Sequence, residues 1–421
     1  MERFRKLIGI TVSLILVLSL CACGGQNGVD SAEESGPVET EESQSEDIYN
    51  KPFTPMEIPS REKAYKLSNT YSKIKGGETL KVAYFGGSVT GGTGSTDADK
   101  YSWRALTTAY LKSISKGGVE EIDASIGGAG SYLGAARFEN DVVSKNPDLL
   151  FIEFAINDVY SDISADLSKA NLEYMINCLY SENPYADIIV VLVTNKSAYG
   201  KQYSSYKAHR EVADYYGIPI VDLGGEFYNK FEGSNGRFIR YFLDSVHPVD
   251  DGYQIYADFI IEALKELMVD APAAEHTLPE KKLCKNGYST LENIKAESIN
   301  DKNWDRFPWF NNTEYEKEGS QFRRGSLKIQ FPEYLAPKAT GSTLTVKFKG
   351  NSFGFLGTVK ENASLKFVLD GKKKKTVKGS DGGNTVEYPV FENLKNASHT
   401  MKITVTGENP YAAIAAFVVT K

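Results

Sequence analysis

Cysteine and histidine are scarce in this chain, with four of each among 421 residues. Cys21 and Cys23 fall within the first 23 residues, so only Cys178 and Cys284 belong to the body of the chain. Two thiols are too few for a disulfide-stapled scaffold, and without a Cys-x-x-Cys pair the sequence gives no sign of a cysteine zinc site. We therefore expect both body cysteines to be free thiols.

An excess of positive charge is also missing, because the formal net charge is -7. Residues 1–23 carry +2 and residues 24–50 carry -8, which leaves -1 for the rest of the chain. A near-neutral body offers no electrostatic footprint for nucleic acid, so no nucleic-acid partner is expected. Phosphate-loop and dinucleotide motifs and His/Cys clusters are absent as well, and we expect neither a cofactor nor a metal.

The one long apolar run stands at the N-terminus, where MERFRK precedes LIGITVSLILVLSL. The run is shorter than the roughly 20 residues that span a bilayer, which favours an export signal over residues 1–23. Its end resembles a bacterial lipobox, in which small Ala22 fits the position before the modified cysteine and Leu20 before Cys21 does not. We predict lipidation at Cys23 and anchoring at the outer face of a bacterial cell membrane, with ordinary secretion as the alternative.

Residues 24–50 are rich in Gly, Ser and Glu and nearly free of aliphatic side chains. Such a segment buries too little apolar surface to fold, and its like charges repel one another. We predict a disordered acidic linker that holds the folded body away from the membrane surface.

Between residues 51 and 270, short apolar runs alternate with amphipathic stretches, as in a parallel sheet with crossover helices. The runs are LKVAYFGG, VEEIDASIGG, DLLFIEFA, DIIVVLVTN and IPIVDLGG. The intervening stretches, such as WRALTTAYLKSI and SYKAHREVADYY, repeat apolar residues at helical spacing. The pattern predicts an α/β domain over residues 51–270, followed by an interdomain linker over residues 271–284.

Residues 285–421 show a different pattern of short alternating runs bounded by turn residues, among them SLKIQF, LTVKFKG, SFGFLGT, LKFVLDG and MKITVTG. This pattern predicts an all-β sandwich, jelly-roll-like, with Asp370-Gly371 as a hairpin turn. The lysine run that follows this turn favours a solvated edge strand. An aromatic group is expected to pack rather than to form a sugar platform, and it comprises Trp304, Phe307, Trp309 and Phe310.

Candidate functional groups follow the first three predicted strands, and ligands of open parallel sheets bind beyond the carboxyl ends of the strands. Two glycines before Ser88 permit a tight turn that exposes its hydroxyl. The N–H groups of Ser88 and Gly128 and the side-chain amide of Asn157 are candidate donors to an oxyanion. Gly127 adjoins Gly128 and remains an alternative donor.

Asp244 stands three residues before His247, a spacing that lets the carboxylate accept from one ring nitrogen while the other faces the serine. A serine hydroxyl becomes a strong nucleophile only when a base of fixed tautomer takes its proton. His209, His276 and His399 stand in a helical pattern, in the linker and in a turn of the β domain, where surface or helix positions are expected. His247 is therefore the candidate base.

The order of Ser, Gly, Asn and Asp-x-x-His resembles the SGNH (GDSL-type) hydrolase superfamily over nearly half of the chain. The resemblance implies a three-layer α/β/α, flavodoxin-like fold and a serine hydrolase that needs no cofactor. It also implies the site residues: the nucleophile Ser88, the base His247 with its partner Asp244, and the oxyanion hole of Ser88, Gly128 and Asn157.

Two positions depart from the usual motifs of that superfamily. Gly87 stands where the GDS form has Asp, but the carboxylate role belongs to Asp244, so catalysis is not threatened. Ala155 stands where glycine is usual, and its methyl group either narrows the pocket or merely fills space. Nearby, Arg137 and Glu153 are expected to form a structural ion pair.

The predicted export places the protein where polymers are met. An SGNH domain joined to a β-sandwich is similar to carbohydrate esterases that remove acetyl groups from polysaccharides. We expect a serine esterase that works through an acyl-enzyme, with an acetylated glycan or another small ester as substrate. Short-chain lipid ester or thioester hydrolysis is the second possibility. A third, from a different class, is an inactive surface lipoprotein that binds glycans, which would require a Ser88 hydroxyl far from His247. Tyr160 could stack on a sugar, although a role in the fold is favoured.

Overall fold

The computed structural model describes residues 53–309, 327–380 and 386–421. Residues 53–421 form one compact unit. The predicted export signal, the predicted lipidation site at Cys23 and the predicted acidic linker lie outside the described residues, as does Phe310. Within the described ranges, no helix has both the length and the apolar character needed to cross a membrane.

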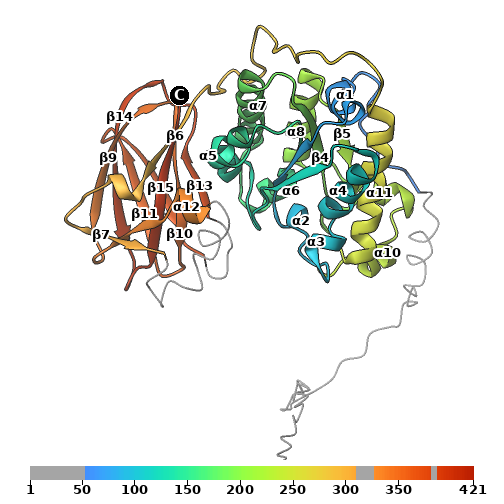
Figure 1. The fold of residues 1–421 in the computed structure, drawn as a ribbon. Helices are drawn as coiled ribbons and strands as arrows, with labels where there is room; N and C mark the ends of the chain where they lie inside the picture. Colours follow the sequence, from blue (N-terminus) through green and yellow to red (C-terminus); the bar gives the residue numbers. More distant parts are fainter. Residues whose placement is uncertain (1–52, 310–326, 381–385) are drawn as a thin grey trace, which may run out of the picture. The chain divides into compact units, whose positions relative to one another are not determined.

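A five-stranded parallel sheet forms the centre of the first half of this unit (Figure 1). Its strand order is β2-β1-β3-β4-β5, the flavodoxin-like order. The strands are β1 (Leu80–Gly86), β2 (Val119–Asp123), β3 (Leu149–Glu153), β4 (Asp187–Leu192) and β5 (Ile220–Asp222). All residues of β3 and β4 are buried, because helices cover both faces of a parallel sheet.

Helices on the two faces complete three layers. One face is covered by α5 (Ser131–Asp141), α7 (Ala165–Glu182) and α8 (Ser204–Tyr216). The other face is covered by α1 (Ser68–Gly76), α4 (Trp103–Ile114), α9 (Leu223–Lys230) and α11 (Asp250–Leu267). Shorter elements lie in the connections, namely α2 (Ser88–Gly91), α3 (Ala98–Tyr101), η1 (Val143–Lys145), α6 (Ala155–Tyr160) and α10 (Asn235–Tyr241). The predicted three-layer α/β/α fold is confirmed.

The second half is a sandwich of two antiparallel sheets, as predicted. The larger sheet holds β6 (Leu291–Lys295), β7 (Trp304–Pro308), β8 (Glu333–Pro337), β10 (Ser352–Val359), β13 (Glu387–Phe391) and β15 (Ala412–Thr420). The smaller sheet holds β9 (Thr343–Gly350), β11 (Ser364–Leu369), β12 (Lys373–Lys378) and β14 (Ala397–Thr406), with η2 (Ala296–Ser298) in a connection. Inward-facing side chains of both sheets, such as Phe355, Phe367 and Ile403, share one hydrophobic core.

The hairpin and the lysine-rich edge occur where the sequence predicted them. Asp370 and Gly371 have φ values of 50° and 69°, as a tight turn between two paired strands requires, and they join β11 to β12. The strand β12 carries the lysine run and lies at the end of the smaller sheet. Charged side chains at such an edge discourage pairing with another chain.

The strand predicted for SLKIQF was wrong, because Leu327–Gln330 forms one helical turn, α12. The alternation of Leu327, Ile329 and Phe331 suggested a strand with one apolar face. In the structure Leu327 and Phe331, four residues apart, are fully buried in the same cluster, whereas Ile329 is 80% exposed. Helical spacing thus brings two of the three apolar side chains onto one face.

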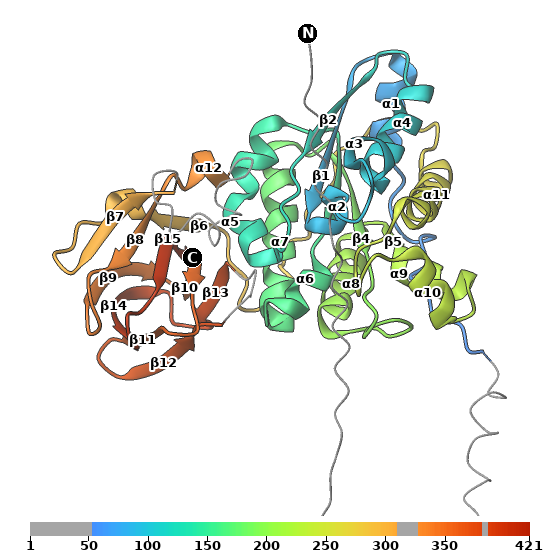
Figure 2. The ribbon, with the colours of Figure 1, turned by 90° about the horizontal axis from the view of Figure 1, so that it is seen from below.

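A hydrophobic cluster continues from the α/β layers into the sandwich, and it includes residues of α5 and α7 together with Trp309, Tyr334 and Val418. The α5 helix carries polar contacts to the β region as well. Asn293 Nδ2 donates to the carbonyl of Ala136 at 2.7 Å. Figure 2 shows α5 between the sheet of the α/β region and the β strands. The two regions therefore share a packed interface.

The aromatic group and the body cysteines also serve the fold. Trp304 is buried in the sandwich core and Trp309 in the shared cluster, so these two rings pack as expected. Cys178 and Cys284 are free thiols, as predicted. Burial raises the pKa of Cys178 to about 11 and that of Cys284 to about 12, so neither is a reactive thiolate at neutral pH.

Candidate active site

Ser88 is the first residue of α2, directly after the buried strand β1. Glu153, at the end of β3, is hydrogen-bonded to this turn. Its Oε2 accepts hydrogen bonds from the N–H of Gly87 at 3.3 Å and from Thr90 Oγ1 at 2.9 Å. Strand β1 and the turn bonded to Glu153 thus fix the position of the serine at the carboxyl edge of the sheet.

His247 and Asp244 reach Ser88 from the loop between α10 and α11. The His247 Nε2 atom lies 2.7 Å from Ser88 Oγ, and the Nδ1 atom lies 2.7 Å from Asp244 Oδ2. The remaining carboxylate oxygen, Oδ1, accepts the N–H groups of Val246 and His247, each at 2.8 Å. The structure therefore brings together the three residues that the sequence nominated as a triad.

The Asp244 carboxylate is held in its ionised form. Its partial burial acts to raise the pKa, but hydrogen bonds from the His247 ring and from two backbone N–H groups outweigh it, and the pKa is lowered. An ionised acceptor at Nδ1 keeps a proton on that nitrogen and leaves Nε2 free to accept one from the serine.

Two backbone hydrogen bonds fix the histidine loop. The Leu243 N–H donates to the His247 carbonyl at 2.8 Å, and the Lys196 N–H donates to the Ser245 carbonyl at 2.8 Å. Gly94 lies against the loop so closely that a Cβ atom there would stand 3.2 Å from His247 Cβ and 2.5 Å from the Pro248 carbonyl oxygen. The base is thus positioned by the segment after the nucleophile and by the segment after β4.

The loop between β2 and α5 brings the glycines next to the serine. A Cβ atom on Gly127 would lie 3.8 Å from Ser88 Cβ. Gly128 has φ +76°, a conformation that favours glycine, and within the described residues its N–H has no hydrogen-bond acceptor. Gly127 does have an interaction of its own. Gly128 therefore stays the candidate donor to an oxyanion, with Gly127 as the alternative.

Asn157 lies in α6, and the residue is buried, with 8% of its surface exposed. Its Nδ2 donates one hydrogen bond to the carbonyl of Ala129 at 2.7 Å, and an amide nitrogen carries a second proton for another acceptor. A Cβ atom on Gly87 would lie only 2.0 Å from this Nδ2 atom. The absence of a side chain at Gly87 thus leaves the space that Asn157 occupies.

The second departure from the usual motifs has a simple explanation, since Ala155 is buried in the hydrophobic cluster and its methyl group fills space there. The expected pair of Arg137 with Glu153 was wrong. Arg137 Nη1 donates to Asp141 Oδ2 at 2.7 Å and to the Ala124 carbonyl at 2.7 Å. Glu153 serves the nucleophile turn instead, and burial raises its pKa to about 7.

The other histidines have structural partners. His209 is buried in α8, with Nε2 3.5 Å from Asp158. His276 bonds to Asp187 at 2.9 Å, and His399 bonds to Asp370 at 2.7 Å. The described part of the chain contains no group of three or more His, Cys, Asp or Glu side chains that could hold a metal ion.

Sequence reasoning missed two buried carboxylates that bond to the end of the loop of residues 127–130, the oxyanion loop, and to the start of α5. Asp158 Oδ1 accepts the N–H of Ser131 at 2.6 Å, and Glu387 of β13 accepts the N–H groups of Gly130 and Leu133 at 2.5 and 2.7 Å. Asp158 adjoins Asn157 and could have been suspected from that position. Glu387 is 257 residues away in sequence from Gly130, and no local pattern marks it.

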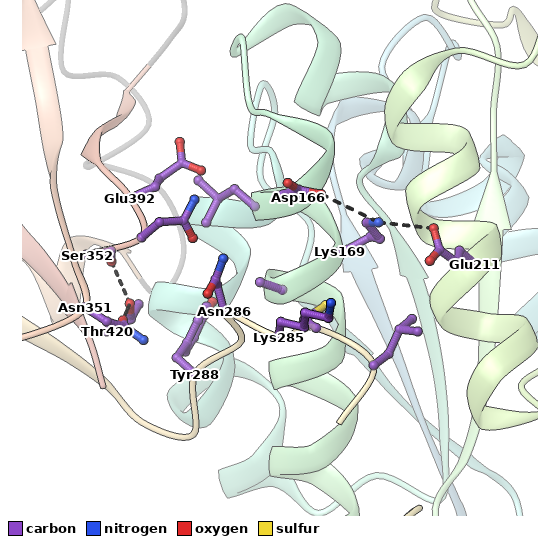
Figure 3. A pocket seen from close by; sticks show the side chains of 15 residues that line it. Asp166, Lys169, Glu211, Lys285, Asn286, Tyr288, Asn351, Ser352, Glu392 and Thr420 are labelled. Atoms are coloured by element: carbon purple, nitrogen blue, oxygen red, sulfur yellow. Dashed lines mark hydrogen bonds and ion pairs between the residues drawn. The ribbon is translucent and has the colours of Figure 1, made fainter. Parts of the chain in front are cut away.

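A separate cavity of about 300 Å³ opens between α7, residues 283–288 and the ends of β10 and β15. Figure 3 shows polar side chains in its lining, where Lys169 pairs with Asp166 and Glu211 and Ser352 bonds to Thr420. The nominated catalytic residues do not line this cavity. It is therefore a feature of the interface between the two regions.

A serine, a histidine and an aspartate in one hydrogen-bonded chain, at the carboxyl edge of a flavodoxin-like sheet, define a serine hydrolase site. Residues 84–255 match the model of the GDSL-like Lipase/Acylhydrolase family. This part of the chain is similar to GDSL-type (SGNH) hydrolase domains. The match and the site together indicate a carboxylic ester hydrolase.

Among solved structures, a two-domain esterase active on acetylated mannans is similar to this chain, with a TM-score of 0.68 and 20% identity. The similarity covers 85% of this chain and 95% of that one. The same description applies to a structure co-crystallized with mannopentaose, with a TM-score of 0.67, 19% identity and coverage of 85% and 96%. These matches show that the two-domain fold is shared. No curated protein matches the chain.

Proposed function

We propose that this protein is an exported serine esterase that removes O-acetyl groups from a polysaccharide or oligosaccharide. The observation that carries the proposal is the chain of 2.7 Å contacts from Ser88 Oγ through His247 to Asp244. The inactive glycan-binding alternative required a serine hydroxyl far from His247, and this geometry counts against it.

The proposed reaction proceeds through an acyl-enzyme. His247 Nε2 takes the hydroxyl proton while Ser88 Oγ attacks the ester carbonyl carbon. The N–H groups of Ser88 and Gly128 and the second Nδ2 proton of Asn157 bind the oxyanion. His247 then gives its proton to the leaving alcohol, and a water molecule activated by the same base releases the acid and restores the serine.

Two observations and one prediction support a glycan as the substrate. The esterase described as active on acetylated mannans shares the fold of both regions of this chain. The Tyr160 ring, three residues after Asn157, is 54% exposed while its hydroxyl accepts a hydrogen bond from Asn195 at 2.8 Å, so its face is available for a sugar. The predicted export places the enzyme outside the cell, where polysaccharides are found.

We expect the purified full-length protein to release acetate from acetylated mannan or acetylated xylan. On p-nitrophenyl esters, kcat/KM is expected to be highest for acetate and at least about tenfold lower for octanoate, because an enzyme selective for acetyl groups binds longer acyl chains less well in the transition state. Released acetate and p-nitrophenol provide the readouts. A preference for octanoate without glycan deacetylation would instead support the lipid-ester alternative.

We further propose that the protein is held at the outer face of the cell membrane through a lipid on Cys23. In a bacterial host, Cys23→Ser is expected to move the protein from the membrane fraction to the soluble fraction, and Cys21→Ser serves as the matched control that keeps it in the membrane. Immunoblots of the two fractions measure the distribution. A membrane-bound Cys23→Ser variant would contradict lipidation at this residue.

A further inference from the structure

One peptide group links the oxyanion hole to the β region. The carbonyl of Ala129 accepts the hydrogen bond from Asn157 Nδ2 at 2.7 Å, and the N–H of the same peptide, on Gly130, donates to Glu387 Oε1 at 2.5 Å. A peptide group is planar, so the direction of its N–H fixes the direction of its carbonyl. Glu387 is therefore linked to the Asn157 amide through one rigid group, the Ala129–Gly130 peptide.

Glu387 also holds the start of the helix that follows the oxyanion loop. Gly130 is the N-cap of α5 and has no side chain with which to cap it. The first N–H groups of the helix have no acceptor within it and donate to carboxylates of other elements. Leu133 N–H donates to Glu387 Oε2 at 2.7 Å, and Ser131 N–H donates to Asp158 Oδ1 at 2.6 Å. A negative charge is favourable at this end of a helix, so both carboxylates restrain the loop from Gly127 to Gly130.

The cost of this arrangement argues against simple docking of two surfaces. Glu387 is 1% exposed, and burial raises its pKa to about 7. Val386 and Val390, on the same segment, are buried apolar side chains and already provide apolar packing there. Burying a carboxylate costs free energy unless its oxygens accept hydrogen bonds. The two Glu387 oxygens accept three of them, from the Gly130 and Leu133 N–H groups and from Ser161 Oγ at 3.0 Å.

The approach of the carboxylate leaves no room for a side chain at the cap. A Cβ atom on Gly130 would stand 2.7 Å from Glu387 Oε1, 2.8 Å from Asp158 Oδ1 and 3.1 Å from Ile163 Cδ1. The loop, α6 and β13 thus converge on this peptide group.

We propose that Glu387 of the β region is a positioning residue for the oxyanion hole, so that the β region takes part in catalysis by orienting the Ala129–Gly130 peptide and, through it, Asn157. This inference rests on ester hydrolysis and on the proposed role of Asn157, and it does not depend on the identity of the sugar. Glu387 itself touches no reacting atom.

The test is Glu387→Gln in the full-length protein with p-nitrophenyl acetate, which contains no sugar. Whichever way the glutamine amide turns, its NH2 group faces either the Gly130 or the Leu133 N–H, so one acceptor is lost while size is kept. We expect kcat to fall about 10- to 100-fold with KM within about twofold, as for the loss of an interaction used in the transition state. The midpoint of thermal unfolding serves to monitor folding.

A double-mutant cycle with Asn157→Ala separates positioning from a structural role. Asn157→Ala alone is expected to lower kcat about 100- to 1,000-fold, as the loss of one oxyanion donor does. Because Glu387 is proposed to act through Asn157, adding Glu387→Gln to that variant should lower kcat by no more than about threefold further. A general loss of folding would lower kcat by the same factor in both backgrounds.

Glu392→Gln is the matched control, because this second glutamate of the β region also bonds across the interface, to Ser164 Oγ at 3.0 Å, but not to the oxyanion loop. Its kcat should stay within about twofold of wild type. A wild-type kcat in Glu387→Gln, or independent effects in the cycle, would overturn the inference alone. Failure of the wild-type protein to hydrolyse the ester would overturn the inference together with the esterase function.

Discussion

Ser88→Ala is expected to abolish ester hydrolysis, with kcat lowered about 10⁴- to 10⁶-fold. The hydroxyl oxygen forms the acyl-enzyme bond, and His247, 2.7 Å away, then has no proton to take. Removal of a triad nucleophile leaves only the modest catalysis that the oxyanion hole and binding provide. Acetate release and p-nitrophenol release are measured side by side.

The stability of the variant should remain close to that of wild type, because the substitution removes one hydroxyl and one hydrogen bond worth about 1 kcal/mol. Ser95→Ala provides the control in the same segment, since Ser95 Oγ donates to the Gly92 carbonyl at 2.6 Å and does not touch the histidine. Residual activity of Ser88→Ala above about 1% of wild type would mean that another group is the nucleophile.

Much of the fold was readable from the sequence because its determinants are local. Continuous apolar runs predicted buried parallel strands, and the two faces of β3 and β4 are indeed covered. Strand β9 alternates buried and exposed residues along its length, as its sequence LTVKFKG indicates. The turn at Asp370-Gly371 was predicted for the same reason, since the backbone requirement falls on the residues themselves.

Candidate site residues were found because the carboxyl ends of parallel strands meet at one edge, which turns positions far apart in sequence into neighbours. Ser88 and His247 are separated by 159 residues and lie in contact. Residues whose role depends on the packing of one region against the other could not be found in this way. Glu387 has no local signal, and only the docking of β13 on the start of α5 and on Ser161 gives it partners.

The short helix α12 is a second example of tertiary control. Leu327, Ile329 and Phe331 fit the strand pattern as well as Leu327 and Phe331 fit one helical face. Contacts with α5 favour the helical turn over a strand. The buried Gln330 side chain donates to Asp141 Oδ1 of α5 at 2.6 Å, and the exposed Ile329 lies away from the core. A five-residue pattern carries too little information to decide between the two periods.

Asp244→Asn is expected to lower kcat about 10³- to 10⁴-fold while leaving the structure intact. The side-chain oxygen is held by the N–H groups of Val246 and His247, so the new NH2 group faces His247 Nδ1. A donor at this place requires Nδ1 to be unprotonated, and the neutral ring then carries its proton on Nε2. That proton faces Ser88 Oγ, and the ring can no longer act as the base in this tautomer.

The chain offers a matched control for this variant in a second aspartate–histidine pair. Asp370 Oδ2 lies 2.7 Å from His399 Nδ1, the same separation as in the active site, and hydrogen bonding to that histidine likewise lowers the pKa of Asp370. Asp370→Asn therefore removes an equivalent interaction in a surface turn of the β region, and its kcat should match wild type. A kcat for Asp244→Asn within about tenfold of wild type would show that His247 keeps its working tautomer without the carboxylate. A similar loss in both variants would instead attribute the effect to stability, which the unfolding midpoints of the two proteins measure directly.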